Sequence, residues 1–215
     1  MPRKRVAILV SGRGSNMAAL IDAAAEPDFP AEIVAVISNR PGAGALAIAE
    51  RAGVATRTID HKAYPSREAF DDALDAELRR IAPDILCFAG FMRLLTPGFI
   101  AKWEGRMLNV HPALLPSFKG LDTHARALAA GVKLHGCTVH LVTAEMDAGP
   151  IVAQAAVPVL DGDDEDALAA RVLAAEHVLY VRALRLWAEG RARLENGRVV
   201  VDAGDPASAT TLIWP

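Results

Sequence analysis

Two polar residues in the segment Asn109-Val110-His111-Pro112 have the side chains that acyl transfer requires. The apolar residues before them predict a strand over 107–110, and if the strand persists to His111, residues 109 and 111 project to the same face. An amide there could stabilise a developing oxyanion while the imidazole moves protons. The other interpretation is a strand end at which Asn109 and His111 only satisfy backbone groups, and the segment alone leaves both open.

A carboxylate further along the chain could complete this pair. Asp147 lies in Glu145-Met146-Asp147-Ala148-Gly149-Pro150, between two predicted strands, from where it could reach the same edge of the sheet. A carboxylate beside an imidazole favours the charged ring and orients it. The alternative is a loop aspartate that caps its own backbone, which is the commoner role of an Asp-x-Gly segment.

A glycine-rich turn, Ser11-Gly12-Arg13-Gly14-Ser15-Asn16, joins the first apolar run to a predicted helix. Glycines let the backbone turn tightly and approach a ligand, and the first N–H groups of a helix attract anions. A phosphate monoester fits this turn, with Ser15 and Asn16 adding hydrogen bonds. The alternative is a plain strand-to-helix turn in which Ser15 is the N-cap.

The same turn departs from the dinucleotide-binding fingerprint. Met17 stands where the third glycine belongs, and Ser38-Asn39-Arg40 replaces the acidic residue expected after the second strand. Arg40 could meet a 2′-phosphate, so a nicotinamide cofactor is disfavoured without being excluded. The lysine of a nucleoside-triphosphate-binding loop is absent from the turn as well.

These residues are positioned by alternating strands and helices. Apolar runs and helical patterns predict strands over 6–10, 33–37, 54–59, 85–88 and 107–110, and helices over 15–25, 43–52 and 66–81. Such an order predicts a parallel sheet with right-handed crossovers, whose strands hold ligands at their carboxyl ends.

The pattern changes after residue 132. Strands predicted over 137–142 and 151–159 are separated only by a loop, so the sheet becomes mixed, and a long helix is predicted over 164–189. Asn196-Gly197 predicts a two-residue hairpin turn between 192–195 and 198–201. The predicted fold class is therefore α/β and Rossmann-like, with helices on both faces of a mostly parallel sheet that is mixed in its C-terminal half.

Composition narrows the function classes. Lys and Arg total 23 against 26 Asp and Glu, a net charge of −3, which argues against a nucleic-acid binder. The apolar run Val6–Val10 is shorter than the roughly 7–15 residues of a signal peptide, and no uncharged run reaches the about 18 residues of a membrane span. Cys87 and Cys137 lack metal-ligand spacing and are expected to be buried free thiols. We therefore expect a cytoplasmic protein without a membrane partner.

Taken together, the motifs closely resemble those of the folate-dependent phosphoribosylglycinamide formyltransferase family. The resemblance runs from about Val6 to about Gly190 and includes the glycine-rich turn. Its other parts are Ala89-Gly90-Phe91-Met92-Arg93, Asn109 to Pro116, Gly136-Cys137-Thr138-Val139-His140 and Asp147-Ala148-Gly149-Pro150-Ile151. Each motif is short, but their order and spacing are highly specific together.

The resemblance implies formyl transfer from 10-formyltetrahydrofolate, as co-substrate, to the amine of glycinamide ribonucleotide in purine biosynthesis. It implies that Asn109 holds the oxyanion, that His111 is the acid for the leaving folate nitrogen, and that Asp147 favours the charged form of His111 and organises a proton-relaying water. No metal is implied.

The resemblance also implies two binding sites. The ribonucleotide phosphate would be held by Gly14, Ser15 and Asn16, and its ribose by Glu176. The residues implied for the folate are Arg67, Met92, Arg93, Leu94, Leu95, Asn109, Thr143, Ala144, Glu145, Met146 and Asp147. We expect His124, His135, His140 and His177 to be structural or surface histidines.

Residues 1–215 are expected to form a single formyltransferase domain. About 1–105 would be its nucleotide- and phosphate-binding half, about 106–202 its catalytic and folate-binding half, and 203–215 a tail. The expected partners are small-molecule substrates only, with neither nucleic acid nor membrane, and the protein could be a monomer or a homodimer.

Three other classes of protein share parts of this pattern of motifs. Methionyl-tRNA formyltransferases normally carry an additional C-terminal domain, and formyltetrahydrofolate deformylases (hydrolases) an N-terminal regulatory one, and we expect neither here. A non-catalytic nucleotide-binding module would not need Asn109, His111 and Asp147 together.

Overall fold

The structure is a computed structural model that describes residues 2–202. Its strands are β1 (Lys4–Val10), β2 (Ala31–Ser38), β3 (Thr56–Thr58), β4 (Ile85–Phe88), β5 (Met107–His111), β6 (Leu134–Leu141), β7 (Ile151–Pro158), β8 (Ala192–Glu195) and β9 (Arg198–Val201). Its helices are α1 (Ser15–Ala25), α2 (Gly44–Arg51), the 3₁₀ turn η1 (His61–Ala63), α3 (Arg67–Ile81), α4 (Pro97–Lys102), α5 (Thr123–Ala129) and α6 (Glu165–Ala188).

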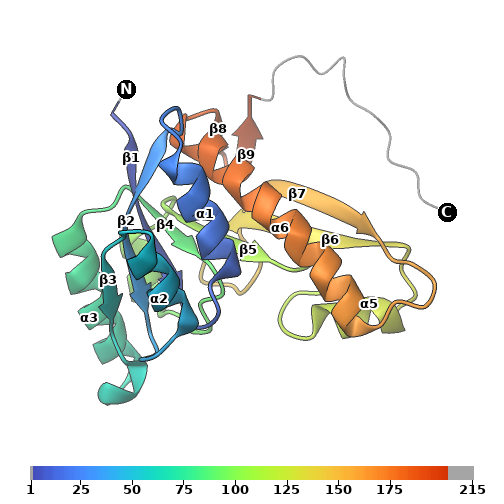
Figure 1. Cartoon of the computed structure of the whole chain (residues 1–215), viewed down its shortest axis with the longest axis horizontal. Coiled ribbons are helices and arrows are strands. Elements are labelled where there is room, and N and C mark those ends of the chain that lie inside the picture. The colour runs from blue at the N-terminus through green and yellow to red at the C-terminus, as the bar shows by residue number, and fades with distance from the viewer. Residues whose placement is uncertain (1, 203–215) are drawn as a thin grey trace.

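Seven strands form one sheet in the order β3-β2-β1-β4-β5-β6-β7 (Figure 1). Every pairing from β3 to β5 is parallel, whereas β6 runs antiparallel to both β5 and β7. The predicted α/β fold, with a mostly parallel sheet that becomes mixed in the C-terminal half, is therefore confirmed.

Helices cover both faces of this sheet because side chains of the buried strands alternate between the two faces. Val6 and Ile8 of β1 belong to a core shared with α1, α2 and α6. Ala7 and Leu9 belong to a second core, which Phe70 of α3 and other residues of α3 and α4 complete. The predicted helices on both faces are confirmed as well.

Helix α6 packs against both the parallel and the antiparallel parts of the sheet (Figure 1). Its Tyr180 is fully buried, and the hydroxyl oxygen lies 2.9 Å from the carbonyl oxygen of Leu108 and 3.2 Å from that of Phe88. One helix thus ties β4 to β5 and joins the two halves of the chain.

The elements that differ from prediction are short. β3 has three residues, and α4 and α5 have six and seven, so none is long enough to show a repeating apolar pattern. The β8–β9 hairpin forms as predicted, with both turn residues at positive φ (50° for Asn196 and 77° for Gly197). Both cysteines are buried and free, as expected.

Two further expectations concern the C-terminal tail and membrane-spanning segments. The predicted tail over 203–215 lies outside the described residues. Within residues 2–202, no helix combines the length and the apolar composition that crossing a membrane would need.

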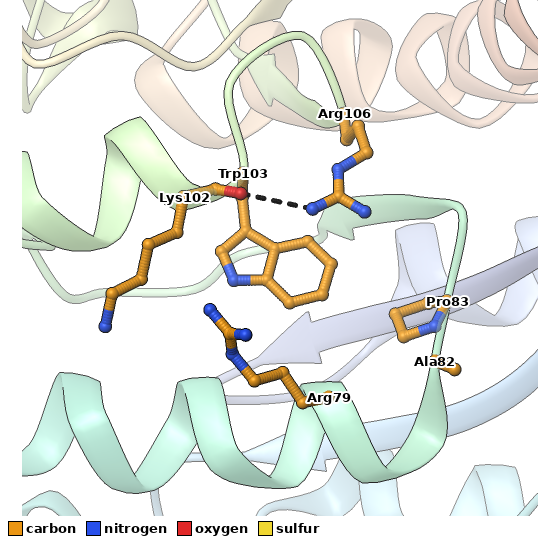
Figure 2. A pocket seen from close by; sticks show the side chains of 6 residues that line it. All are labelled: Arg79, Ala82, Pro83, Lys102, Trp103 and Arg106. Carbon is orange, nitrogen blue, oxygen red and sulfur yellow. Dashed lines mark hydrogen bonds between the residues drawn. The ribbon is translucent and has the colours of Figure 1, made fainter.

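A cavity of about 300 Å³ opens where α3 and α4 end, near the starts of β4 and β5 (Figure 2). Asp75 accepts a hydrogen bond from Trp103 Nε1 at 2.9 Å, and its carboxylate pairs with Arg79 at 3.0 Å and Lys102 at 3.1 Å. The Arg106 guanidinium lies 4.2 Å from the Trp103 ring centre. These contacts fix α3 to α4.

Candidate active site

Asn109 and His111 lie on β5, which extends to His111 as the sequence analysis requires. Leu108 and Val110 point into the core beneath α6, so Asn109 and His111 project to the other face. His140 of β6 is the antiparallel partner of Asn109 and shares that face. Three polar side chains therefore gather on one side of β5 and β6.

The His111 ring lies between two hydrogen-bond acceptors. Its Nδ1 is 3.4 Å from Asp147 Oδ2, and its Nε2 is 3.0 Å from the carbonyl oxygen of Phe118. A carbonyl oxygen and a carboxylate both accept, so each ring nitrogen of His111 faces an acceptor. These two contacts hold the imidazole beside Asn109, where it could exchange a proton with a ligand.

Asp147 reaches this ring from the loop between β6 and β7. Its Oδ2 accepts a hydrogen bond from the Gly120 amide at 2.9 Å, and its backbone is left-handed with φ 51°. The Gly120 contact also links the Asp147 loop to the segment after His111. Two loops that are distant in sequence are thereby held around one imidazole.

The segment after β5 is anchored to β6 and β7. The Thr138 hydroxyl donates to the carbonyl oxygen of Ala113 at 2.7 Å and accepts from the Leu115 amide at 3.0 Å. Gln154 Nε2 donates to the Leu115 carbonyl oxygen at 2.9 Å. These bonds fix the path of the chain toward Phe118, whose carbonyl contacts His111.

The Asn109 amide is oriented by His140. The amide nitrogen lies 3.1 Å from His140 Nε2, and the other ring nitrogen, Nδ1, lies 2.9 Å from the Leu141 carbonyl oxygen. The ring must donate from Nδ1, so Nε2 accepts from Asn109 when the ring is neutral. Burial lowers the pKa of His140, which keeps the ring neutral.

His140 is therefore a buried histidine that orients the Asn109 amide, which is a structural role of the kind expected for it. The antiparallel register of β5 with β6 is the signal that could have found it, because cross-strand partners share a face. That register could not be read from two strands joined by a long connection.

The glycine-rich turn begins α1 without a side-chain cap. Gly14, at φ 85°, is the N-cap and Ser15 is the first helical residue, so the alternative in which Ser15 caps the helix is wrong. A Cβ on Gly14 would lie 2.6 Å from Ala45 Cβ of α2, so glycine is required here for packing as well as for the turn. The first N–H groups of α1 thus remain available to an anion.

The structure brings Asn16 and Glu176 together across the fold. Asn16 Nδ2 donates to Glu176 Oε2 at 2.7 Å, while the buried Asn16 Oδ1 has no partner among the described residues. Burial raises the pKa of Glu176, because the charged carboxylate loses solvation. The pair therefore presents polar atoms that a ligand hydroxyl could satisfy.

Three apolar residues implied for the folate are exposed to solvent. Met92, Leu94 and Met146 are exposed by 62%, 57% and 52% respectively, although large apolar side chains are usually covered. The Met92 amide donates to Ser11 Oγ at 2.8 Å, which joins this segment to the glycine-rich turn.

The remaining residues implied for the folate lie in three separate segments of the chain. Thr143 Oγ1 donates to the Glu145 carbonyl oxygen at 3.1 Å within the 143–147 loop, which also contains Ala144. Leu95 is partly buried against the second core, and Arg93 stacks over the Phe70 ring. Arg67 is the first residue of α3, and within residues 2–202 no hydrogen bond or ion pair joins its side chain to the others.

Two histidines, the buried His135 and the partly buried His124, lie beside the segment that holds Phe118. The rings of His124 and His135 meet edge to face at 5.3 Å, and neither nitrogen of His135 has a partner among the described residues. Burial lowers the pKa of both rings, to about 4 for His135, because a charged ring would be unsolvated there.

We expect this pair to make folding stability depend on pH. The His135 pKa is lower in the folded chain than in the unfolded one, so the unfolded chain takes up the proton first as pH falls from 6.5 toward 4. The free energy of unfolding should fall by roughly 2–4 kcal/mol across that window. Urea unfolding of the wild type and of His135→Phe at several pH values measures it. An equally steep pH dependence in both proteins would contradict the assignment to His135.

The fold and the cluster together define an α/β protein equipped for acyl-type group transfer. The chain belongs to the formyl transferase family, whose model matches residues 4–184.

Its relatives include both large and small proteins. It is 53% identical to the trifunctional purine biosynthetic protein adenosine-3 of Bos taurus over 92% of its own length, but spans only 20% of that protein. It is 44% identical to phosphoribosylglycinamide formyltransferase of Escherichia coli, with 92% of this chain and 93% of the relative covered. The solved phosphoribosylglycinamide formyltransferase of Brucella melitensis is 62% identical, with a TM-score of 0.84, covering 86% of this chain and 96% of that one.

Proposed function

We propose that this protein transfers the formyl group of 10-formyltetrahydrofolate to the amine of N1-(5-phospho-D-ribosyl)glycinamide. The products are the N-formyl ribonucleotide and tetrahydrofolate, in a step of purine biosynthesis. The observation that carries the proposal is the contact between His111 and Asp147 beside Asn109, in a chain that aligns with almost the whole Escherichia coli relative of that name. Its cytoplasmic location, its monomeric or dimeric state and its organisation as a single domain stay predictions.

The two substrates would approach the cluster from different segments. The ribonucleotide phosphate would accept hydrogen bonds from Gly14, Ser15 and Asn16 at the start of α1, and Glu176 would bind the ribose hydroxyls. The pterin would pack against the exposed apolar side chains of Met92, Leu94 and Met146. Both reacting groups would then meet beside Asn109 and His111.

The chemistry needs one oxyanion donor and one acid. The substrate amine attacks the formyl carbon, a C–N bond forms, and the carbonyl oxygen becomes an oxyanion that the free N–H of Asn109 stabilises. His111 then gives its proton to N10 of the folate as the bond from N10 to the formyl carbon breaks. The proton released by the amine passes to a water held by Asp147, whose charge also stabilises the protonated His111. No metal is proposed for any step.

The proposal is tested by mixing the purified protein with the ribonucleotide and a 10-formyl folate and following release of the deformylated folate. We expect release only when the ribonucleotide is present, with equal amounts of formylated ribonucleotide. Release in its absence would instead show a hydrolase. Binding of both compounds without release would show a non-catalytic module.

A second test concerns the phosphate site. Gly14→Val should weaken ribonucleotide binding by about tenfold or more, because a branched side chain blocks the approach of the phosphate to the turn. Folate binding should change less. The substitution also pushes against Ala45, so the melting temperature is measured alongside calorimetric titrations of both ligands. Equal losses for both ligands would refute the assignment.

A further inference from the structure

A second cavity lies at the same edge of the sheet as the glycine-rich turn, outside the residues assigned to either substrate. It has a volume of about 430 Å³ and is lined by Arg40, Pro41, Asp60, His61 and Lys62. Arg40 and Pro41 follow the end of β2, and His61 and Lys62 follow the end of β3. The cavity therefore lies where parallel strands end, which is where such sheets usually bind ligands.

The cations of this cavity differ from those around Trp103 (Figure 2). There, the ammonium and guanidinium groups are committed to Asp75, to the Lys102 carbonyl oxygen and to the indole face. In contrast, the side chains of Arg40 and Lys62 have no hydrogen-bond or ion-pair partner within residues 2–202. Two positive charges thus line this cavity without an ion-pair partner among the described residues.

Asp60 is the one acidic residue of this lining, and it is hydrogen-bonded to the backbone of the same segment. Asp60 Oδ1 accepts a hydrogen bond from the Lys62 amide at 3.0 Å and so caps the 3₁₀ turn η1. The same oxygen lies 3.9 Å from His61 Nδ1. The carboxylate therefore orients the segment that carries His61 and Lys62.

The His61 ring is held by a chain of hydrogen bonds. Its Nδ1 lies 2.7 Å from the Asn39 carbonyl oxygen and 3.3 Å from Asn39 Nδ2. Asn39 is buried, and its Oδ1 accepts from Ser11 Oγ at 2.6 Å. No partner of His61 Nε2 is found among the described residues, so this ring atom is not committed to another protein group.

We propose that this cavity binds the phosphoryl group of a second, phosphorylated ligand. A phosphoryl group carries its negative charge on three oxygens, which match the two cations of the lining, the Arg40 guanidinium and the Lys62 ammonium, beside the His61 ring. A carboxylate offers only two. The site is distinct from the glycine-rich turn and does not depend on the proposed reaction.

The test is a titration of the substrate-free protein with inorganic phosphate, followed by the NMR signals of the His61 ring and of the Ser15 and Asn16 amides. We expect the His61 signals to move saturably. In Arg40→Ala/Lys62→Ala the response of His61 should weaken at least about tenfold, while Ser15 and Asn16 respond as before. The control Lys4→Ala/Arg51→Ala removes the same charge from exposed positions elsewhere and should leave the His61 response unchanged.

Three results would overturn the proposal: no saturable movement of the His61 signals, equal weakening in the control variant, or an equally tight response to acetate. Titration with AMP separates the two sources of a phosphoryl group. Tighter binding of AMP than of phosphate at His61 assigns the cavity to a phosphate ester, and the reverse assigns it to the free ion.

Discussion

Replacing His111 by alanine is expected to lower the rate of formyl transfer by at least ~10²–10⁴, the usual contribution of a general acid. The folate nitrogen is a poor leaving group until it is protonated, and the His111 ring, 3.4 Å from the Asp147 carboxylate, is the group proposed to protonate it. Ribonucleotide binding should be kept, because the glycine-rich turn does not contact this ring. Steady-state rates together with calorimetric titration of the ribonucleotide measure both quantities.

A milder variant separates the acid from the group that supports it. Asp147→Asn keeps an oxygen that can accept from the Gly120 amide but removes the charge beside His111. It should reduce the rate less than His111→Ala does. Retained turnover in His111→Ala would remove this residue from the mechanism, and a larger loss in Asp147→Asn would make Asp147 the principal group.

Replacing Asn109 by alanine is expected to lower kcat by about 10²–10³, as removal of one oxyanion donor commonly does. KM for either substrate should change little, because the hydrogen bond strengthens only when negative charge develops on the oxygen. The substitution also leaves the buried His140 Nε2 without its partner, which costs about 1–3 kcal/mol of stability. Rates are therefore compared well below the melting temperature of the variant.

His140→Ala is the matched comparison for this prediction. It removes the acceptor that orients the Asn109 amide but leaves the amide itself, so its effect on kcat should be smaller than that of Asn109→Ala. An Asn109→Ala protein with normal kcat and a raised KM would mean that Asn109 only binds the ground state.

Much of the fold follows from local patterns. The apolar runs of β1, β2 and β4 are buried on both faces, so they read as continuous hydrophobic segments and predict a parallel sheet. The long helix α6 and the Asn196-Gly197 turn are equally local signals. The helices α4 and α5 were not predicted because each is under two turns long and is specified by caps and tertiary contacts.

The candidate site depends more on contacts between distant segments. Asn109 and His111 could be placed on one face because a strand alternates, but their contacts with Asp147 and His140 depend on loop paths and register. Asn16 and Glu176 are 160 positions apart, and no local pattern joins them. The family resemblance, and no local pattern, predicts that Asn16 and Glu176 contribute to the same binding site.

The position of α6 has a consequence for how the chain acquires its structure. Because this helix packs on β5 and β6 and also carries Glu176 and Tyr180, the apolar face of β5 stays uncovered until α6 has been synthesised. A nascent chain that ends before Glu165 would leave Leu108 and Val110 without the helix that covers them. The segments before and after β5 should therefore fold as one cooperative unit rather than one after the other.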